Sequence, residues 1–208
     1  MKVIGIICFG DSVLAGTGAS TRDNCCSKII KASVNIPVFL KGLNRDSSSG
    51  GLNRLESDVL QNPSCSHVLI LFGNNDSWIR SNNQPETTIE QFEHNIKKIV
   101  EQITANNKIA ILLNLQPLDG EKFIQNFPNH FNEQTAFYGD PVSWQKQYSD
   151  SIERMVHAYE WEFIDIRTPL EKDVTNVIGP DGLHPNDLGH KIIAETVLNY
   201  FKRYGLFI

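Results

Sequence analysis

An apolar run at the start of the chain constrains the fold more than any other feature. Residues 3–8 are apolar or small, and they lead directly into Phe9-Gly10-Asp11-Ser12. A run of this kind, stopped by a Gly-Asp-Ser turn, is typical of a fully buried parallel strand. Open α/β proteins keep their functional sites at the carboxyl ends of such strands. The pattern therefore places Ser12 at that edge of a sheet, as a candidate nucleophile.

Further strand-like runs alternate with helical patterns along the rest of the chain. The strand-like runs cover 3–9, 37–40, 67–72, 108–115 and 162–166. The helical stripes cover 52–59, 89–103, 148–159 and 188–201. This alternation predicts an α/β fold, a flavodoxin-like three-layer sandwich with a five-stranded parallel sheet and helices on both faces. The length of 208 residues predicts a single domain over 1–208.

Charge and composition favour a small-molecule partner. The net charge is −5, and no basic run is longer than Lys97-Lys98. These features argue against nucleic acid and anionic membrane surfaces as partners. No apolar stretch is long enough to span a bilayer, so we expect no stable membrane anchor. The sequence does not indicate an oligomeric state.

Cysteine, histidine and glycine spacing predicts no metal and no cofactor. The cysteines are Cys8, Cys25, Cys26 and Cys65, without zinc-type spacing, and we expect free thiols in a reducing compartment, the cytoplasm. The remaining histidines of interest, His94, His130, His157 and His190, have no partner at metal-ligand spacing, so we expect solvated or capping side chains. Gly16-Thr17-Gly18 lacks the third glycine of a dinucleotide-binding loop.

A second candidate motif lies just before the last helical stripe, at Asp181-Gly182-Leu183-His184-Pro185. An Asp and a His three residues apart on a turn allow the carboxylate to accept from Nδ1 while Nε2 points away. Taken alone, the motif is more typical of a helix cap with a solvated histidine. Its combination with Ser12 favours His184 as a general base and Asp181 as the residue that orients it.

A third motif, Gly73-Asn74-Asn75-Asp76, directly follows the third strand-like run. The amide of Asn75 is a candidate donor to the charged oxygen of a reacting acyl group. An ordinary Asx turn explains the same composition. We interpret Asp11 and Asp76 as structural carboxylates that brace their turns.

Together, the Gly-Asp-Ser, Gly-x-Asn-Asp and Asp-x-x-His-Pro motifs resemble three of the four sequence blocks of the GDSL (SGNH) hydrolases, in the same order. The resemblance implies a flavodoxin-like fold and a catalytic triad of Ser12, Asp181 and His184. It also implies an oxyanion hole from the Ser12 backbone N–H, the Asn75 side chain and a backbone N–H of the fourth block. The activity implied is cleavage of carboxylic esters through an acyl-enzyme, without a cofactor. Substrates in this family include acyl esters, lysophospholipids, thioesters, aryl esters and sugar O-acetyl esters.

The fourth block is where the sequence departs from the family. The family usually has a glycine there, and aligning 51–55 with the following helix places Arg45 in that position. A shift of register would place Gly42 or Gly50 there instead. A side chain that spoiled the oxyanion hole would leave a non-catalytic ligand-binding protein on the same fold, which is the alternative function.

One long connection has no clear periodicity. Residues 116–138 carry five aromatic side chains and follow the fourth strand-like run. Long connections in compact domains are usually functional, so this segment is a candidate wall of a substrate pocket. Aromatic packing beneath an ordinary loop is the other interpretation. Trp78 is likewise either a pocket wall or part of the core.

Overall fold

The computed structural model describes residues 5–130 and 138–205. In this part of the chain, five strands form one parallel sheet in the order β2-β1-β3-β4-β5. The strands are β1 (Ile6–Gly10), β2 (Val38–Gly42), β3 (His67–Leu71), β4 (Ile109–Leu113) and β5 (Glu162–Ile164). The α/β fold and the flavodoxin-like strand order expected from the sequence are confirmed.

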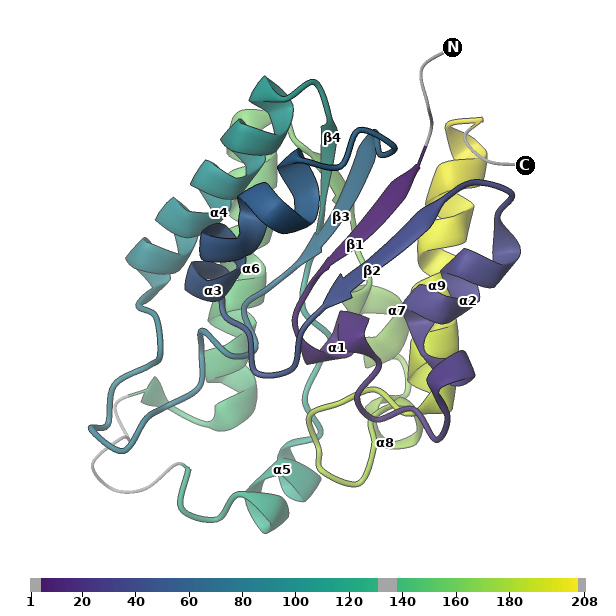
Figure 1. Ribbon diagram of the computed structural model, residues 1–208. Helices are drawn as coiled ribbons and strands as arrows, with labels where there is room; N and C mark the ends of the chain where they lie inside the picture. The colour runs from purple at the N-terminus through teal and green to yellow at the C-terminus, as the bar shows by residue number, and fades with distance from the viewer. Residues whose placement is uncertain (1–4, 131–137, 206–208) are drawn as a thin grey trace.

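Helices cover both faces of the sheet (Figure 1). One face carries α3 (Ser48–Leu55), α4 (Ile89–Ala105) and α6 (Pro141–Tyr159), and the other carries α2 (Cys26–Ser33) and α9 (Asp187–Arg203). The shorter helices are α1 (Ser12–Ala15), α5 (Gly120–Asn126), α7 (Arg167–Glu171) and α8 (Val174–Val177), with a 3₁₀ turn at Arg22–Asn24 and a π-helical turn at Glu56–Leu60. The three layers match the expected sandwich.

The register of the central strands brings their carboxyl ends level. Gly10, at the end of β1, pairs with Gly42 of β2 on one side and with Leu71 of β3 on the other. The loops that follow these strands therefore start from one edge of the sheet. Ser12, Arg45 and Asn75 lie just beyond the ends of these three strands.

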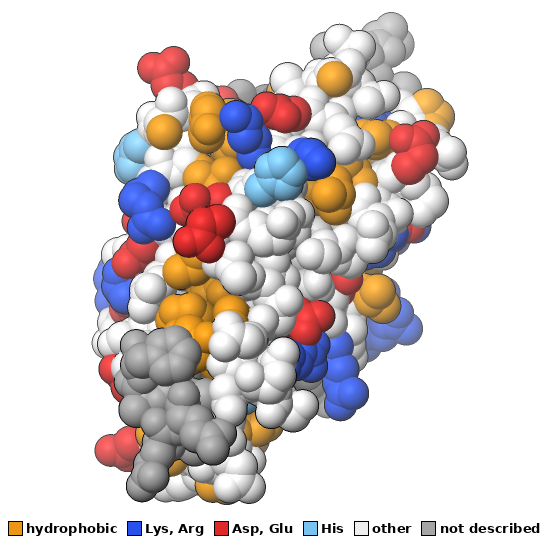
Figure 2. All heavy atoms as spheres, turned by 90° about the vertical axis from the view of Figure 1, so that its left-hand side faces the viewer, with side chains coloured by type: hydrophobic (Ala, Val, Ile, Leu, Met, Phe, Trp, Pro, Cys, Tyr) orange, Lys and Arg blue, Asp and Glu red, His pale blue; other side chains and the backbone are white. Residues whose placement is uncertain are grey.

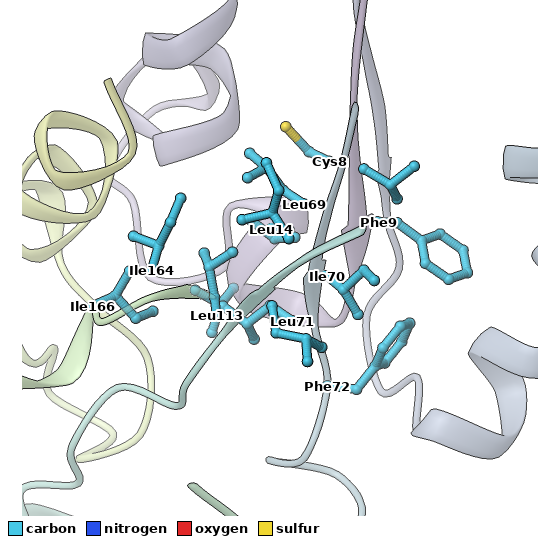
Figure 3. Packing of buried hydrophobic residues seen from close by; sticks show 14 of the residues in the cluster. Cys8, Phe9, Leu14, Leu69, Ile70, Leu71, Phe72, Leu113, Ile164 and Ile166 are labelled. Carbon is cyan, nitrogen blue, oxygen red and sulfur yellow. The ribbon is translucent and has the colours of Figure 1, made fainter. Parts of the chain in front are cut away.

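The core packs against both sides of β1 and β3 (Figure 3). Phe9 and Phe72 lie on the same side in an edge-to-face contact, with 5.2 Å between ring centroids. A Cβ atom added at Gly51 would lie 2.5 Å from the Phe72 ring, so the glycine allows α3 to pack closely there. Leu14, Leu69 and Leu113 lie on the opposite side of the sheet.

The helices α6 and α9 differ in part from the apolar stripes predicted for them. α6 begins at Pro141, before the predicted start at Tyr148, because Asp140 caps it by accepting from the N–H groups of Val142 and Ser143. In α9, Leu188 was expected on the apolar stripe, but it is 48% exposed. It lies in the first turn, to one side of the buried face that continues through Ile193.

The outer face of α4 and α6 carries acidic and basic side chains intermixed with small apolar areas (Figure 2). Some of them form ion pairs, including Lys146 with Asp150 at 2.6 Å and Arg154 with Glu93 at 3.2 Å. Exposed pairs of this kind contribute little to stability. Within residues 5–130 and 138–205, no helix is both long enough and apolar enough to cross a bilayer.

Candidate active site

Ser12 is the first residue of α1, immediately beyond the end of β1. Asp11 caps this short helix, because its Oδ1 accepts from the Val13 N–H at 2.9 Å. The Asp11 carboxyl is fully buried, and burial raises its pKa to about 6, against the opposing effect of hydrogen bonds from Asn74 and Val13. The cap fixes the turn, so that the Ser12 hydroxyl faces the cavity described below.

His184 connects Ser12 to Asp181. The Ser12 Oγ lies 2.9 Å from His184 Nε2, and His184 Nδ1 lies 2.6 Å from Asp181 Oδ2. An ionised carboxylate can only accept a hydrogen bond, so Nδ1 carries the proton and Nε2 is left to accept from the serine hydroxyl. The structure thus brings the three predicted side chains into one hydrogen-bonded chain.

Asp181 is held as an anion. Burial alone would raise its pKa, but hydrogen bonds from the His184 side chain and from the backbone N–H groups of Leu183 and His184 lower it to about 2. The same backbone bonds close the turn over Asp181-Gly182-Leu183-His184. Gly182 has φ +74°, a left-handed conformation that glycine adopts without strain.

The loop after α1 packs tightly against this turn. A Cβ atom added at Gly18 would lie 2.2 Å from the Pro185 carbonyl oxygen and 2.8 Å from the His184 Cβ. Gly18 also has φ +95°. The segment that carries Ser12 and the segment that carries His184 are therefore in direct van der Waals contact.

Asn75 follows β3 and lines the same cavity as Ser12. Its Nδ2 donates one hydrogen bond to the Asp46 carbonyl oxygen at 2.9 Å, which leaves the second hydrogen for a ligand. The neighbouring Asp76 is fully buried and accepts from the Ser48 N–H and hydroxyl. Burial raises the pKa of Asp76 to about 6, although the bonds from Ser48 and Thr87 oppose the shift. The turn at Asn75 is thereby fixed to the start of α3.

Arg45 lies in the turn between β2 and α3, with φ +62°. This left-handed conformation is the one that glycine adopts readily and that costs other residues about 1 kcal/mol. Arg45 lines the cavity. Gly42 lies within β2 and Gly50 within α3, so Arg45 is the residue of the three that has the backbone conformation typical of glycine at the cavity. Among the described residues, neither the Arg45 N–H nor the Ser12 N–H has a hydrogen-bond acceptor.

The cavity that these residues line has a volume of about 540 Å³. Trp78, Phe127 and Leu183 form its apolar wall. Trp78 is half-buried and stacks on His130 with 3.9 Å between ring centroids. Burial, and then the nearby charge of Arg80, lower the pKa of His130 to about 4, so its ring is neutral near pH 7.

The segment 116–138 contains the short helix α5, which the sequence did not predict. From this segment Phe127 lines the cavity, and Phe123 packs against Trp78 in an edge-to-face contact. Tyr138 packs on Trp144, with 4.3 Å between ring centroids. Residues 131–137, which include Phe131 and Phe137, lie outside the described residues.

A buried polar network beneath the site was missed from the sequence. Asn74 Nδ2 donates to Asp11 Oδ2 at 2.9 Å, and Asn74 Oδ1 accepts from Gln116 and Gln145. Gln116 also donates to the Leu183 carbonyl oxygen at 3.1 Å. The network therefore connects the loops that carry Ser12, Asn75 and His184.

Arg54, which sequence reasoning treated as part of an ordinary helix, connects the ends of two strands. Its guanidinium donates to the carbonyl oxygens of Gly10 and Lys41 and pairs with Asp46 at 2.8 Å. It also stacks on the Phe9 ring, at 4.3 Å from the centroid. Arg54 thereby fixes the start of the loop that contains Arg45.

Two histidine predictions were wrong, since His130 packs on Trp78 and is neither solvated nor capping. His190 was expected to be solvated or capping, but it is fully buried in α9. Its Nε2 donates to the Thr17 carbonyl oxygen at 3.0 Å, and its Nδ1 accepts from the Cys26 N–H. Burial lowers its pKa.

The described residues include no group of three His, Cys, Asp or Glu placed to hold a metal, and all four cysteines are free and buried.

Comparison with known proteins adds independent evidence. The model of the GDSL-like lipase/acylhydrolase family matches residues 8–192. No curated protein matches the sequence significantly. Among solved structures, a lipase/acylhydrolase from Enterococcus faecalis is 21% identical with a TM-score of 0.75, over 97% of this chain and 96% of that one.

Two further solved structures share the fold. An acetylxylan esterase from Geobacillus stearothermophilus is 20% identical with a TM-score of 0.71, over 96% of this chain and 95% of that one. A psychrotrophic esterase from Pseudoalteromonas sp. is 19% identical with a TM-score of 0.69, over 96% of this chain and 97% of that one.

Proposed function

Because the chain belongs to the GDSL-like lipase/acylhydrolase family, we propose that it is a serine hydrolase that cleaves carboxylic esters through an acyl-enzyme intermediate. The observation that carries this proposal is the hydrogen-bonded chain from the Ser12 hydroxyl through His184 to Asp181. A serine hydroxyl is a weak nucleophile near neutral pH, and an adjacent base oriented by a carboxylate is what activates it.

In the first half of the reaction, Ser12 Oγ attacks the ester carbonyl carbon while His184 Nε2 takes the hydroxyl proton. The carbonyl oxygen becomes an oxyanion, which accepts hydrogen bonds from the Ser12 N–H, the Arg45 N–H and the Asn75 amide. Collapse of this intermediate breaks the bond to the leaving alkoxide, which takes the proton from His184. The products are an alcohol and an ester of Ser12 with the acyl group.

Water completes the cycle by the same chemistry. His184 takes a proton from a water molecule as the water oxygen attacks the acyl carbon. The second oxyanion uses the same three donors, and its collapse returns the proton to Ser12 Oγ and releases a carboxylic acid. Throughout, Asp181 accepts from the Nδ1–H and stabilises the positive charge that forms on the ring.

The third oxyanion donor, the Arg45 N–H, lies where the sequence departs from the family pattern. Arg45 has a side chain where the family usually has glycine, but its φ of +62° keeps the backbone in the left-handed conformation. Its N–H remains without an acceptor among the described residues. Both observations support a working oxyanion hole and weaken the alternative of a non-catalytic binding protein.

A panel of p-nitrophenyl esters with increasing acyl length tests the proposal, with the Ser12→Ala protein as the matched control. We expect hydrolysis by the wild type, at a rate at least about 10³ times that of Ser12→Ala. The apolar wall of Trp78, Phe127 and Leu183 favours an apolar acyl or aryl group. Lysophospholipids and acyl thioesters, added to the same panel, distinguish lysophospholipase or thioesterase activity from simple esterase activity. A wild type no faster than Ser12→Ala on every substrate would favour the binding protein.

A further inference from the structure

The Arg45 side chain is the feature of the cavity that the proposed reaction does not use. Four non-glycine residues among those described have a positive φ: Arg45, Asn83, Asn107 and Glu160. Asparagine tolerates this conformation, and Glu160 ends a helix, where it is common. Arg45 is neither an asparagine nor a helix end, and of the four it alone lines the cavity. A strained residue of this kind at a cavity points to a functional position.

The charges around the cavity leave Arg45 without a counter-ion. Among the residues that line it, the ionised cations are Arg45 and Arg80, and none is a carboxylate. The nearby carboxylates are engaged with other residues, since Asp46 pairs with Arg54 and Asp181 accepts from His184. The cavity lining therefore offers positive charge and no carboxylate to an incoming ligand, in a protein whose net charge is −5.

Arg45 and Arg80 differ in one respect that matters for binding. Arg80 forms an ion pair with Glu86, so its charge is already compensated. Arg45 makes no hydrogen bond or ion pair with any residue that the structure describes. An exposed guanidinium that lacks a partner presents two parallel N–H groups to a ligand and binds carboxylate or phosphate oxygens in pairs.

We propose that Arg45 is a specificity-determining residue, whose guanidinium binds an anionic carboxylate or phosphate group of the ester substrate. This inference rests on the proposed hydrolase function. The Arg45 backbone lies beside the proposed oxyanion site. The distance between the anionic group and the ester carbonyl is therefore no greater than the reach of one arginine side chain. The substrate class is therefore an ester with an anionic group close to the reacting carbon, and the apolar wall contacts the remainder.

Pairs that each match an anionic ester with a neutral one test the proposal. The first pair is 4-acetoxybenzoate and 4-acetoxybenzamide, with the charge on the alcohol side. The second is mono-p-nitrophenyl adipate and its methyl ester, with the charge on the acyl side. A third, 4-acetoxyphenyl phosphate compared with 4-acetoxybenzamide, separates phosphate from carboxylate. The readout is the ratio of kcat/KM for the anionic ester to that for its neutral partner, which cancels any change in the oxyanion hole common to both.

We expect the wild type to favour the anionic member of at least one pair, and Arg45→Gly to lower that ratio about tenfold, mainly through KM. Arg45→Lys retains the positive charge but not the two parallel N–H groups, so its ratio should fall by less. Arg80→Gln is the matched control at the same cavity, and its ratio should change less than about twofold. Ratios that are equal in the wild type and in Arg45→Gly would overturn the proposal.

Calorimetric titration of the same esters into Ser12→Ala and Ser12→Ala/Arg45→Gly separates this inference from the proposed function. Binding to Ser12→Ala that is selective for the anionic ester and depends on Arg45 supports the inference even if the wild type hydrolyses none of the esters. Equal affinities of both proteins for the anionic ester would overturn the inference even if the wild type is an active esterase.

Discussion

The Ser12 hydroxyl and His184 Nε2 lie 2.9 Å apart, although 172 residues separate them in the chain. Ser12 stands at the end of the central strand β1, and His184 lies on the turn before α9. The contact depends on two packed loops, because Gly18 allows the loop after α1 to lie directly against Pro185.

Replacing the nucleophile should abolish catalysis without unfolding the protein. We expect Ser12→Ala to lower kcat by about 10³-fold or more, because the triad acts as a unit. A fluorophosphonate probe should label Ser12 in the wild type and nothing in the variant, as read by mass spectrometry. Labelling of a different serine, or a folded Ser12→Ala protein with most of its activity, would contradict the mechanism.

The Asn75 amide should act on the transition state rather than on substrate binding. We expect Asn75→Ala to lower kcat by about 10²–10³-fold with little change in KM, because the hydrogen bond strengthens only when the oxygen becomes charged. Steady-state kinetics on a neutral ester measure both constants. A change confined to KM would assign Asn75 to substrate binding instead.

Asp181→Asn should reduce activity. It should also remove the stability that the ionised carboxylate contributes above about pH 4. We expect kcat to fall by about 10³-fold or more, because the amide no longer fixes the proton on His184 Nδ1. The folded pKa of Asp181, about 2, lies below its ordinary value. The ionised carboxylate therefore stabilises the fold above about pH 4, and this contribution disappears as pH falls through 2.

Asp181 is about one third exposed, so solvent screening limits this contribution to about 1 kcal/mol. Urea unfolding of the wild type and Asp181→Asn at pH 2 and pH 6 measures it. The difference in free energy of unfolding should be larger at pH 6, and a difference independent of pH would contradict the assignment.

Asp76 should show the opposite dependence on pH. Burial raises its folded pKa to about 6, so the folded protein binds a proton more tightly than the unfolded chain. Stability from this group is greatest below about pH 4 and falls by about 3 kcal/mol as pH rises through 6. We expect Asp76→Asn to destabilise the protein at both pH values, but by less at pH 7 than at pH 4. If the loss of stability in Asp76→Asn is instead greater at pH 7 than at pH 4, Asp76 is ionised in the folded protein at both pH values.

Arg45→Gly should make the protein slightly more stable. Glycine relieves the strain of φ +62°, and the gain is partly offset by the greater freedom of glycine in the unfolded chain, leaving about 0.5 kcal/mol. Glu160→Gly, at φ +54° on the far end of α6, is the matched control and should give a similar gain. If Arg45→Gly lowers stability while Glu160→Gly raises it, the Arg45 side chain makes a stabilising contact within the fold.

The main features of fold and site were predictable because they depend on local patterns. The apolar runs identified the five strands, and the motifs after β1 and β3 placed Ser12 and Asn75 at one edge, since parallel strands share the direction in which they end. The φ of Arg45 could not be predicted, because backbone conformation at a single turn residue has no periodic signal.

What was missed depends on contacts between residues far apart in sequence. Gln116 and Gln145 look like ordinary polar residues until Asn74 is seen between them. The role of Arg54 depends on carbonyl groups of two other elements. His190 looks like an exposed helix residue, and only the packing of α9 against α2 buries it. Patterns within one segment do not record such partners.

The separation of Ser12 from His184 also has a consequence for synthesis of the protein. At ordinary ribosomal rates of about 5–20 residues per second, the serine precedes its base by roughly 10–30 s. During that interval the β1 segment can pair with β2 and β3, but no histidine is available at position 184 to activate Ser12. In the proposed mechanism, the serine of the nascent chain is therefore an ordinary, unreactive hydroxyl, and it gains its base only when the turn before α9 docks beside α1.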